Sequence, residues 1–385
     1  MSDVLAKIGD GLWNAVLMAY EVWWALVLGF AISAIVQAWV PRERIERSLS
    51  GSGPGALLRA TGFGAASSSC SYAAIAIARS LFAKGASVAT ALAFQFASTN
   101  LVWELGLVLW VLIGWQFTLA EFVGGLILIA LMAAFLRLFV SPALEQQARR
   151  HAGEAASGHA HEHGHAAGGT GGASWRRRLR SVDAWTEVAG YFRSDWKMLW
   201  KEITVGFLLA GFIALLGDDF FNFLFVEDAP AAPRTIENVI AGPLIAVLSF
   251  VCSVGNVPLA AVLWSGGISF GGVMGFIFAD LIVLPIVAAY RKYYGTAFAL
   301  RITALMFVTM VLAALVVDGL FGLAGLVPTD RPSTEDVFGS IALDYKLALN
   351  VFGAIVFATL MYLALRPAPE RARDGGLASA AAESR

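Results

Sequence analysis

The sequence predicts an all-α polytopic membrane protein made of two inverted structural repeats, each with an interrupted, re-entrant helix pair. Hydrophobic residues make up 58% of the 385 residues and charged residues only 14%, whereas a soluble domain is about a quarter charged. Several apolar stretches reach the roughly 20 residues that a helix needs to cross the hydrocarbon core. Because lipid offers no partner to backbone polar groups, these spans must be helical.

The third observation is an internal repeat at a constant offset of 182 residues. Residues 70–98 align with residues 252–280, and nine of the 29 positions are identical. The only two cysteines, Cys70 and Cys252, fall on equivalent positions. Matching interrupted apolar segments in two halves are typical of secondary transporters, and they point to the binding site. We therefore expect about 7–10 membrane segments in a duplicated core.

The expected elements follow from apolar runs and their interruptions. In chain order they are a span at 13–40 that stops at Pro41, a punctuated apolar region at 60–113, a span at 117–140, an amphipathic stretch at 182–200 that leads into a span ending near Gly217, a second punctuated region at 239–289, and spans at 297–324 and 347–365.

These elements predict five parts of the chain. They are a first transmembrane repeat at 1–140, a His/Gly/Ala-rich cytoplasmic linker at 141–181, an amphipathic helix and second transmembrane repeat at 182–325, an extracytoplasmic loop and last transmembrane helix at 326–365, and a disordered cytoplasmic tail at 366–385.

The distribution of Lys and Arg predicts the orientation. The basic stretches are 42–59, 137–201, 291–301 and 366–385, whereas the loops at 218–238 and 325–345 are acidic. We therefore expect a bacterial inner (plasma) membrane protein with an extracytoplasmic N-terminus and with the His-rich linker and the C-terminus in the cytoplasm. At the 182-residue offset, equivalent spans then run in opposite directions, which is the inverted arrangement.

Each punctuated region must cross the membrane an odd number of times to satisfy this orientation. The economical solution is one re-entrant hairpin, at about 61–83 or 240–265, followed by one crossing. Three shorter crossings per region are the alternative.

The two hairpin tips are the first candidate site. Broken backbone at membrane depth is tolerated where protein buries it or where it lines a cavity, and half-helix ends offer partial charges to a solute. Two thiolates suit a soft, thiophilic species, although free Cys is also a common small buried residue and small residues also favour close helix packing. The candidate substrate-binding residues at the tips are Ser69, Cys70, Ser71, Cys252, Ser253, Asn256 and Pro258.

A second cluster follows each tip. Gln95 and Asn100 are candidate substrate-binding residues, and Asp280 stands at the repeat position of Ser98. A carboxylate near the centre of a membrane helix costs about 2.5–3.5 kcal/mol on insertion scales, so it usually faces a cavity or a partner. Asp280 and Glu104 are therefore candidate coupling residues, with a shallower position beside a basic group as the alternative for Glu104.

The linker contains a candidate metal site. Its alternating His159, His161, His163 and His165 can bind zinc, nickel or copper, and a solvated linker with incidental metal affinity is the alternative. The basic run at 175–180 and the aromatic residues of 182–200 predict an interfacial helix that is attracted to anionic lipid.

Catalysis is not expected. The glycines at 51–55 lack the Lys-Ser/Thr ending of a phosphate loop, and no HExxH motif occurs. We therefore predict that the protein is not an enzyme and needs no cofactor. Its expected partners are the lipid bilayer and a small-molecule or metalloid substrate, with no nucleic acid; a homo-oligomer stays open.

The paired Cys-Ser motifs at matching apolar segments resemble the predicted permease family that includes the organoarsenical efflux permeases (ArsP-like). Cys252-Ser253 followed by Pro258-Leu259 matches the family pattern, and the resemblance covers about residues 20–365. The first motif departs from it, because Ser68-Ser69-Cys70-Ser71 stands where many members have Cys-Ser-Cys. The resemblance implies efflux of small thiophilic or organometalloid compounds.

Together these observations predict a permease that works by alternating access, with gradient-driven efflux of a small thiophilic or arsenical-like solute. The alternatives are a divalent metal-cation transporter that uses the His-rich linker, and a non-transporting membrane scaffold.

Overall fold

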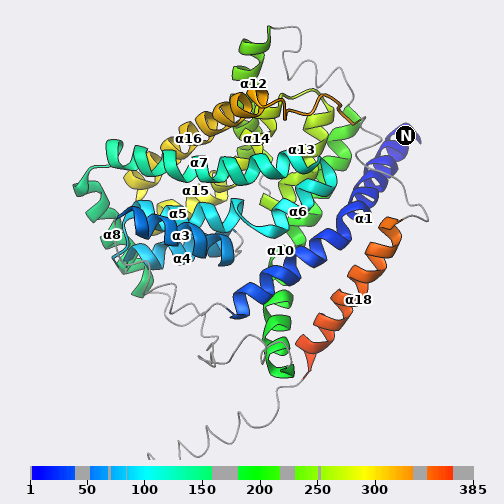
Figure 1. Ribbon diagram of the computed structural model, residues 1–385, viewed down its shortest axis with the longest axis horizontal. Coiled ribbons are helices and arrows are strands. Elements are labelled where there is room, and N and C mark those ends of the chain that lie inside the picture. The colour runs from blue at the N-terminus through cyan, green and yellow to red at the C-terminus, as the bar shows by residue number, and fades with distance from the viewer. Residues whose placement is uncertain are drawn as a thin grey trace, which may run out of the picture.

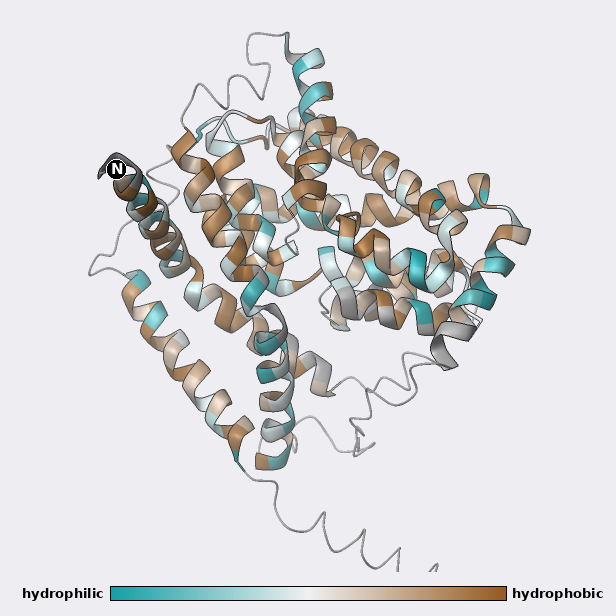
Figure 2. Ribbon diagram, turned by 180° about the vertical axis from the view of Figure 1, so that it is seen from behind, coloured by the Kyte–Doolittle hydropathy of each residue, from teal (hydrophilic) through white to brown (hydrophobic). Residues whose placement is uncertain are grey.

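The computed structural model describes residues 2–39, 53–67, 71–83, 85–157, 181–216, 230–249, 253–332 and 345–366. Within these ranges the chain is helical and contains no β-strand, so the all-α prediction is confirmed. Figure 1 shows the helices crossing at steep angles, with both halves of the sequence intermixed. Figure 2 shows hydrophobic residues along most helices and hydrophilic residues gathered at the outer end of α12 and on α8.

The helices recur in the same order in the two halves. The first half contains α1 (Ser2–Trp39), α3 (Pro54–Ser67), α4 (Ser71–Ala83), α5 (Val88–Asn100), α6 (Trp103–Leu112) and α7 (Trp115–Phe139), followed by α8 (Pro142–Ser157). The second half contains α10 (Val182–Ile213) with η1 (Ala214–Leu216), α12 (Ala231–Ser249), α13 (Ser253–Ser265), α14 (Phe270–Phe278) with η2 (Ala279–Leu281), α15 (Leu284–Tyr294) and α16 (Thr296–Leu323), followed by α18 (Tyr345–Leu365).

The helix bounds repeat at the offset found in the sequence. Adding 182 to the bounds of α4 gives those of α13, and the same shift takes the start of α5 to the start of α14. The turns before α5 and α14 are also alike, because Gly85 and Gly267 have φ of 106° and 102°. A positive φ of this size favours glycine, which explains the identity at this pair. Ser87 and Ser269 then cap the two helices by accepting backbone N–H bonds.

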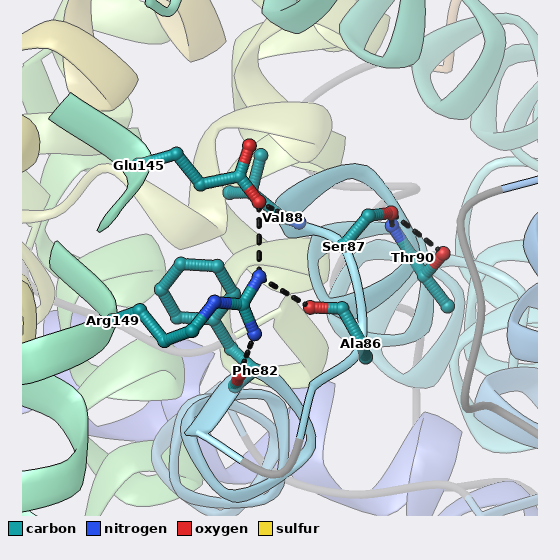
Figure 3. A network of polar contacts seen from close by, with 7 residues as sticks. All are labelled: Phe82, Ala86, Ser87, Val88, Thr90, Glu145 and Arg149. Carbon is teal, nitrogen blue, oxygen red and sulfur yellow. Dashed lines mark hydrogen bonds and ion pairs between the residues drawn. The ribbon is translucent and has the colours of Figure 1, made fainter. Parts of the chain in front are cut away.

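An arginine clamp on this turn is duplicated as well. The Arg149 guanidinium lies 4.2 Å from the centre of the Phe82 ring and donates hydrogen bonds to the carbonyls of Phe82 and Ala86 (Figure 3). Its counterpart 182 residues later, Arg331, lies 4.1 Å from the Trp264 ring and donates to the Trp264 carbonyl. Since Trp264 is the counterpart of Phe82, the repeat extends well beyond the aligned segment. Whether the two halves are inverted relative to a membrane stays a prediction.

Six helical segments in the described ranges are long and apolar enough to cross a membrane: Leu5–Ile32, Val88–Leu112, Trp115–Phe139, Phe270–Tyr294, Thr296–Leu323 and Tyr345–Leu365. Two shorter apolar helical segments, Ile203–Leu216 and Ser253–Ser265, join them. Two of the six are interrupted: one joins α5 to α6, and the other joins α14 through η2 to α15. The helices α4 and α13 have 13 residues each, so each is about 20 Å long, short of the roughly 30 Å hydrocarbon core.

The amphipathic stretch begins α10. Residues 182–200 form one continuous helix with the apolar segment that follows them. Trp196 packs with its ring centre 5.3 Å from that of Trp23 and 5.2 Å from that of Phe30. Part of its aromatic face is therefore used in packing against α1, and its attraction to anionic lipid stays a prediction.

The last helix, α18, packs against α1 and α10. Its Asn350 side chain accepts a hydrogen bond from the Trp24 N–H at 3.1 Å and donates one to the Tyr20 carbonyl at 2.9 Å. In an undisturbed helix the Trp24 N–H would donate to the Tyr20 carbonyl, four residues earlier. Lys346 forms an ion pair with Glu21 at 2.7 Å. Polar contacts therefore fix α18 to the middle of α1.

Candidate functional site

The site forms where the two halves meet at Asp280. This residue lies in η2, at the interruption between α14 and α15, and its exposed fraction is 0%. The Ser71 hydroxyl donates a hydrogen bond to Asp280 Oδ2 at 3.2 Å. The hydroxyl of Ser253 is a second hydrogen-bonding neighbour of the same carboxylate. Ser71 and Ser253 are equivalent by the repeat, so the two halves bring matching serines to one acidic side chain.

These serines are the first residues of two short helices. Ser71 begins α4 and Ser253 begins α13. The first turn of a helix has backbone N–H groups without partners in the helix and a partial positive charge. Two such N-termini at one carboxylate make an electropositive surrounding for an acid or for the anionic part of a solute.

The first turn of α13 is held closely against α10. A Cβ added at Gly206 of α10 would lie 2.2 Å from the carbonyl oxygen of Gly255, so only glycine allows this approach. Asn256 follows, fully buried, and its Oδ1 accepts a hydrogen bond from Ser249 at 3.2 Å. Pro258 is buried one turn into α13, where its missing N–H leaves one carbonyl of the helix unpaired. The backbone near the second tip is therefore tightly positioned and polar.

Gln95 and Asn100 lie on α5 and are also fully buried. Gln95 donates a hydrogen bond to the hydroxyl of Tyr290 on α15, and Tyr290 is an electrostatic neighbour of Asp280. Asn100 donates to the Phe96 carbonyl and to the Thr99 hydroxyl, both on its own helix. Among the described residues, the side-chain oxygens of Gln95 and Asn100 accept no hydrogen bond.

Glu104 lies in a different environment from Asp280. It is 6% exposed on α6, with α1 pressed against it at Gly29, and its electrostatic neighbour is Asp195 of α10. The side chain is buried in the protein because the absence of a side chain at Gly29 lets α1 cover it. Its coupling role, and the alternative of a shallower position beside a basic group, stay predictions.

Seven predicted site residues lie outside the described residues. They are Ser69, Cys70 and Cys252 at the two tips, and the linker histidines His159, His161, His163 and His165. Their roles stay predictions.

Sequence reasoning missed Glu121 and Tyr290. Glu121 lies on α7, is 0% exposed and is an electrostatic neighbour of Asp280. The signal was present, because Glu121 stands alone as an acid in the apolar run 117–140. Tyr290 gave no comparable signal, since a tyrosine near a helix end more often anchors the membrane interface.

The duplicated helices, the interrupted crossings and the buried polar centre agree with the comparison to known families. The model of the predicted permease family (ArsP_1) matches residues 14–319. The chain belongs to this predicted permease family. The match begins within α1, ends within α16 and does not reach α18.

This family member is similar to two curated relatives. It is 46% identical over 327 residues to Rv2963 of Mycobacterium tuberculosis, which has a permease name; the alignment covers 84% of this chain and 79% of that protein. It is 28% identical over 151 residues to the UPF0718 protein YraQ of Escherichia coli, covering 38% of this chain and 44% of that protein. No solved structure matches the permease. Family membership and the membrane-spanning helices assign it to membrane transport.

Proposed function

We propose that this permease exports a small thiophilic or organometalloid solute across the bacterial inner membrane by alternating access, driven by an ion gradient. The observation that supports this best is the convergence of Ser71 and Ser253 on Asp280. Two equivalent helix N-termini from the two halves then form one site, and a rocking motion of the halves opens it first to one side and then to the other.

The proposed substrate chemistry rests on the residues next to these serines. Cys70 directly precedes Ser71, and Cys252 directly precedes Ser253. With both serines at Asp280, each cysteine is one residue away from a side chain of the site. Two thiolates suit a soft metalloid centre such as trivalent arsenic, and a cysteine next to a helix N-terminus is favoured as the thiolate.

The site also explains why a gradient is needed. Asp280 Oδ1 has no hydrogen-bond partner among the described residues, although the side chain is fully buried. An ionised carboxylate in this position is costly unless a cation or a proton neutralises it. Loading and unloading of that charge in the two orientations couples solute movement to the gradient.

The test is uptake of trivalent methylarsenical by everted membrane vesicles, with and without a proton gradient. Wild type is compared with Cys70→Ser, Cys252→Ser and Asp280→Asn. The proposal predicts uptake by wild type, its loss in either serine variant, and loss of gradient dependence in Asp280→Asn with substrate exchange preserved. Absence of uptake by inserted wild-type protein would rule out the arsenical substrate.

A further inference from the structure

Glu121 is the buried acid that the proposed function leaves unused. It lies in the second turn of α7, and its exposed fraction is 0%. Neither of its carboxylate oxygens has a hydrogen-bond partner among the described residues. Burying an ionised carboxylate without a partner costs several kcal/mol on any scale. A side chain in this state needs a positive charge from elsewhere.

Asp280 faces Glu121 from the other half of the molecule. The two carboxylates interact electrostatically, and Asp280 Oδ1 is also unpaired in the described part of the chain. The ion pairs found there, Arg149 with Glu145 and Lys346 with Glu21, involve neither acid. Two like charges in a low-dielectric interior repel each other strongly. The pair is therefore stable only when it shares a cation.

Glycines on α7 bring Glu121 to this place. A Cβ added at Gly124 would lie 2.2 Å from the Phe278 ring, two residues before Asp280. A Cβ added at Gly125 would lie 2.6 Å from Leu101 and 3.7 Å from Asn100 Cβ. Thus α7 presses against both interrupted crossings at their breaks, with Glu121 one turn earlier on the same helix.

Among the described residues, the two acids and two amides of α5 have oxygens without a hydrogen-bond partner. They are Oε1 and Oε2 of Glu121, Oδ1 of Asp280, Oε1 of Gln95 and Oδ1 of Asn100. The buried Asn256 of α13 leaves a donor, Nδ2, unpaired as well. Oxygen ligands suit hard cations, in contrast to the soft species that thiolates prefer. The cation and a thiophilic solute would therefore use different atoms of neighbouring groups.

Charged residues on the surrounding helices have other partners. Arg301 donates to the Phe139 carbonyl, Arg234 donates to the Gly267 carbonyl, and Asp318 accepts from the Gly271 N–H. The titratable group that faces the acid pair is Tyr290, whose hydroxyl is bonded to Gln95. No protein cation in the described ranges takes the place of the missing charge.

We propose that Glu121 and Asp280 together bind one monovalent cation, a proton or a sodium ion, at the interface between the two halves. As the coupling ion of transport, this cation rests on the proposed function; as a bound ion, it does not. Each half supplies one carboxylate, so removing the cation leaves two like charges across the interface. That repulsion favours separation of the halves, and rebinding of the cation favours their closure.

The test measures cation binding without any transported solute. The purified full-length protein in detergent is heated while sodium replaces choline at constant ionic strength, and in a second series while the pH is lowered. A bound ion raises the unfolding midpoint in proportion to the logarithm of its concentration above the dissociation constant. The variants are Glu121→Gln, Asp280→Asn, the double variant, and Asp183→Asn as an exposed acid of α10 outside the pair.

The proposal predicts that wild type and Asp183→Asn respond to one of the two cations, and that each single variant of the pair loses most of this response. The double variant should respond no less than either single one, because one ion bridges both acids. Response to sodium at fixed pH identifies sodium, and response to pH alone identifies the proton. A full response in Glu121→Gln or in Asp280→Asn, or a double variant that responds clearly less than both single variants, would overturn the proposal.

A fallback variant and a comparison with the transport assay complete the test. If Glu121→Gln does not yield folded protein, Glu121→Asp tests the same pair with a shorter acid and is expected to weaken cation affinity at least tenfold. If wild type binds the cation but moves no arsenical in vesicles, the proposed substrate fails while the cation site stands.

Discussion

Removal of the Arg149 guanidinium is expected to loosen the turn that joins α4 to α5. In Figure 3, Arg149 lies over Phe82 and donates from Nη1 to the Phe82 carbonyl, while its Nη2 donates to both the Ala86 carbonyl and Glu145 Oε1. The Ala86 bond is 3.0 Å long, as is the ion pair with Glu145. Because the Arg149 side chain is still 30% exposed, the contribution of each interaction to the free energy of unfolding is taken from the low end of its usual range.

The magnitude follows from these contacts. Two hydrogen bonds from a charged group contribute about 1.5 kcal/mol each at the low end, the cation–π contact about 0.5 kcal/mol, and the i,i+4 ion pair about 0.3 kcal/mol. Allowing for water that replaces part of this bonding, Arg149→Ala should lower the free energy of unfolding by about 2–3 kcal/mol. Arg149→Lys should lose more than half of that, because an ammonium lacks the planar fork.

The assay is denaturant unfolding of the purified protein in detergent, followed by tryptophan fluorescence. Glu145→Gln is the matched control and should change the free energy of unfolding by no more than about 0.5 kcal/mol. Arg331→Ala, at the equivalent position, should resemble Arg149→Ala. The reasoning is refuted if Arg149→Ala stays within about 0.5 kcal/mol of wild type, which is the usual range for a surface substitution without a role.

Three further experiments test the packing and the site. Gly206→Ala should lower the free energy of unfolding by about 1–3 kcal/mol, because its Cβ would overlap the Gly255 carbonyl. Gly190→Ala on the same helix has open space around its Cβ and should be neutral or stabilising. Equal effects of the two substitutions in an unfolding assay would contradict the close approach. Asn350→Ala should lower the free energy of unfolding by about 1–3 kcal/mol, because the Trp24 N–H and the Tyr20 carbonyl of α1 lose their hydrogen bonds to this side chain. Thr359→Ala on α18 is the control. A neutral Asn350→Ala would mean that other contacts hold α18. Ser71→Ala and Ser253→Ala should each reduce vesicle uptake. In the double variant the two effects should differ from their sum by a coupling free energy of about 0.5–3 kcal/mol, because both hydroxyls act on Asp280. Strictly additive effects would mean that the two serines act separately.

The fold was predictable from the sequence because its causes are local and repeated. Long apolar runs require helices in lipid, and the identities Gly85/Gly267 and Ser87/Ser269 mark a turn with a positive φ and a helix cap. The same offset relates Arg149 to Arg331, which a longer alignment of the two halves would have revealed. The start of α10 was harder, because an amphipathic helix has the same pattern whether lipid or a neighbouring helix covers its apolar face.

The site was predictable only in part. Ser71, Ser253 and Asp280 were selected from the repeat, but their convergence depends on how α4, α13 and η2 cross in space. Glu121 was missed because the repeat gives it no acidic counterpart: residues 302 and 303 are Ile and Thr. A search for isolated acids in apolar spans finds such residues where a search for symmetry does not.

The most direct test of the inverted duplication is the sidedness of two equivalent positions. Gln147 and Thr329 are 182 residues apart, and both are exposed. Single cysteines are placed at each in a background with Cys70 and Cys252 replaced by serine, and a membrane-impermeant maleimide is added to intact cells and to everted vesicles. The account predicts labelling of Thr329→Cys in cells and of Gln147→Cys only in everted vesicles. Labelling of both positions from the same side would contradict an inverted repeat.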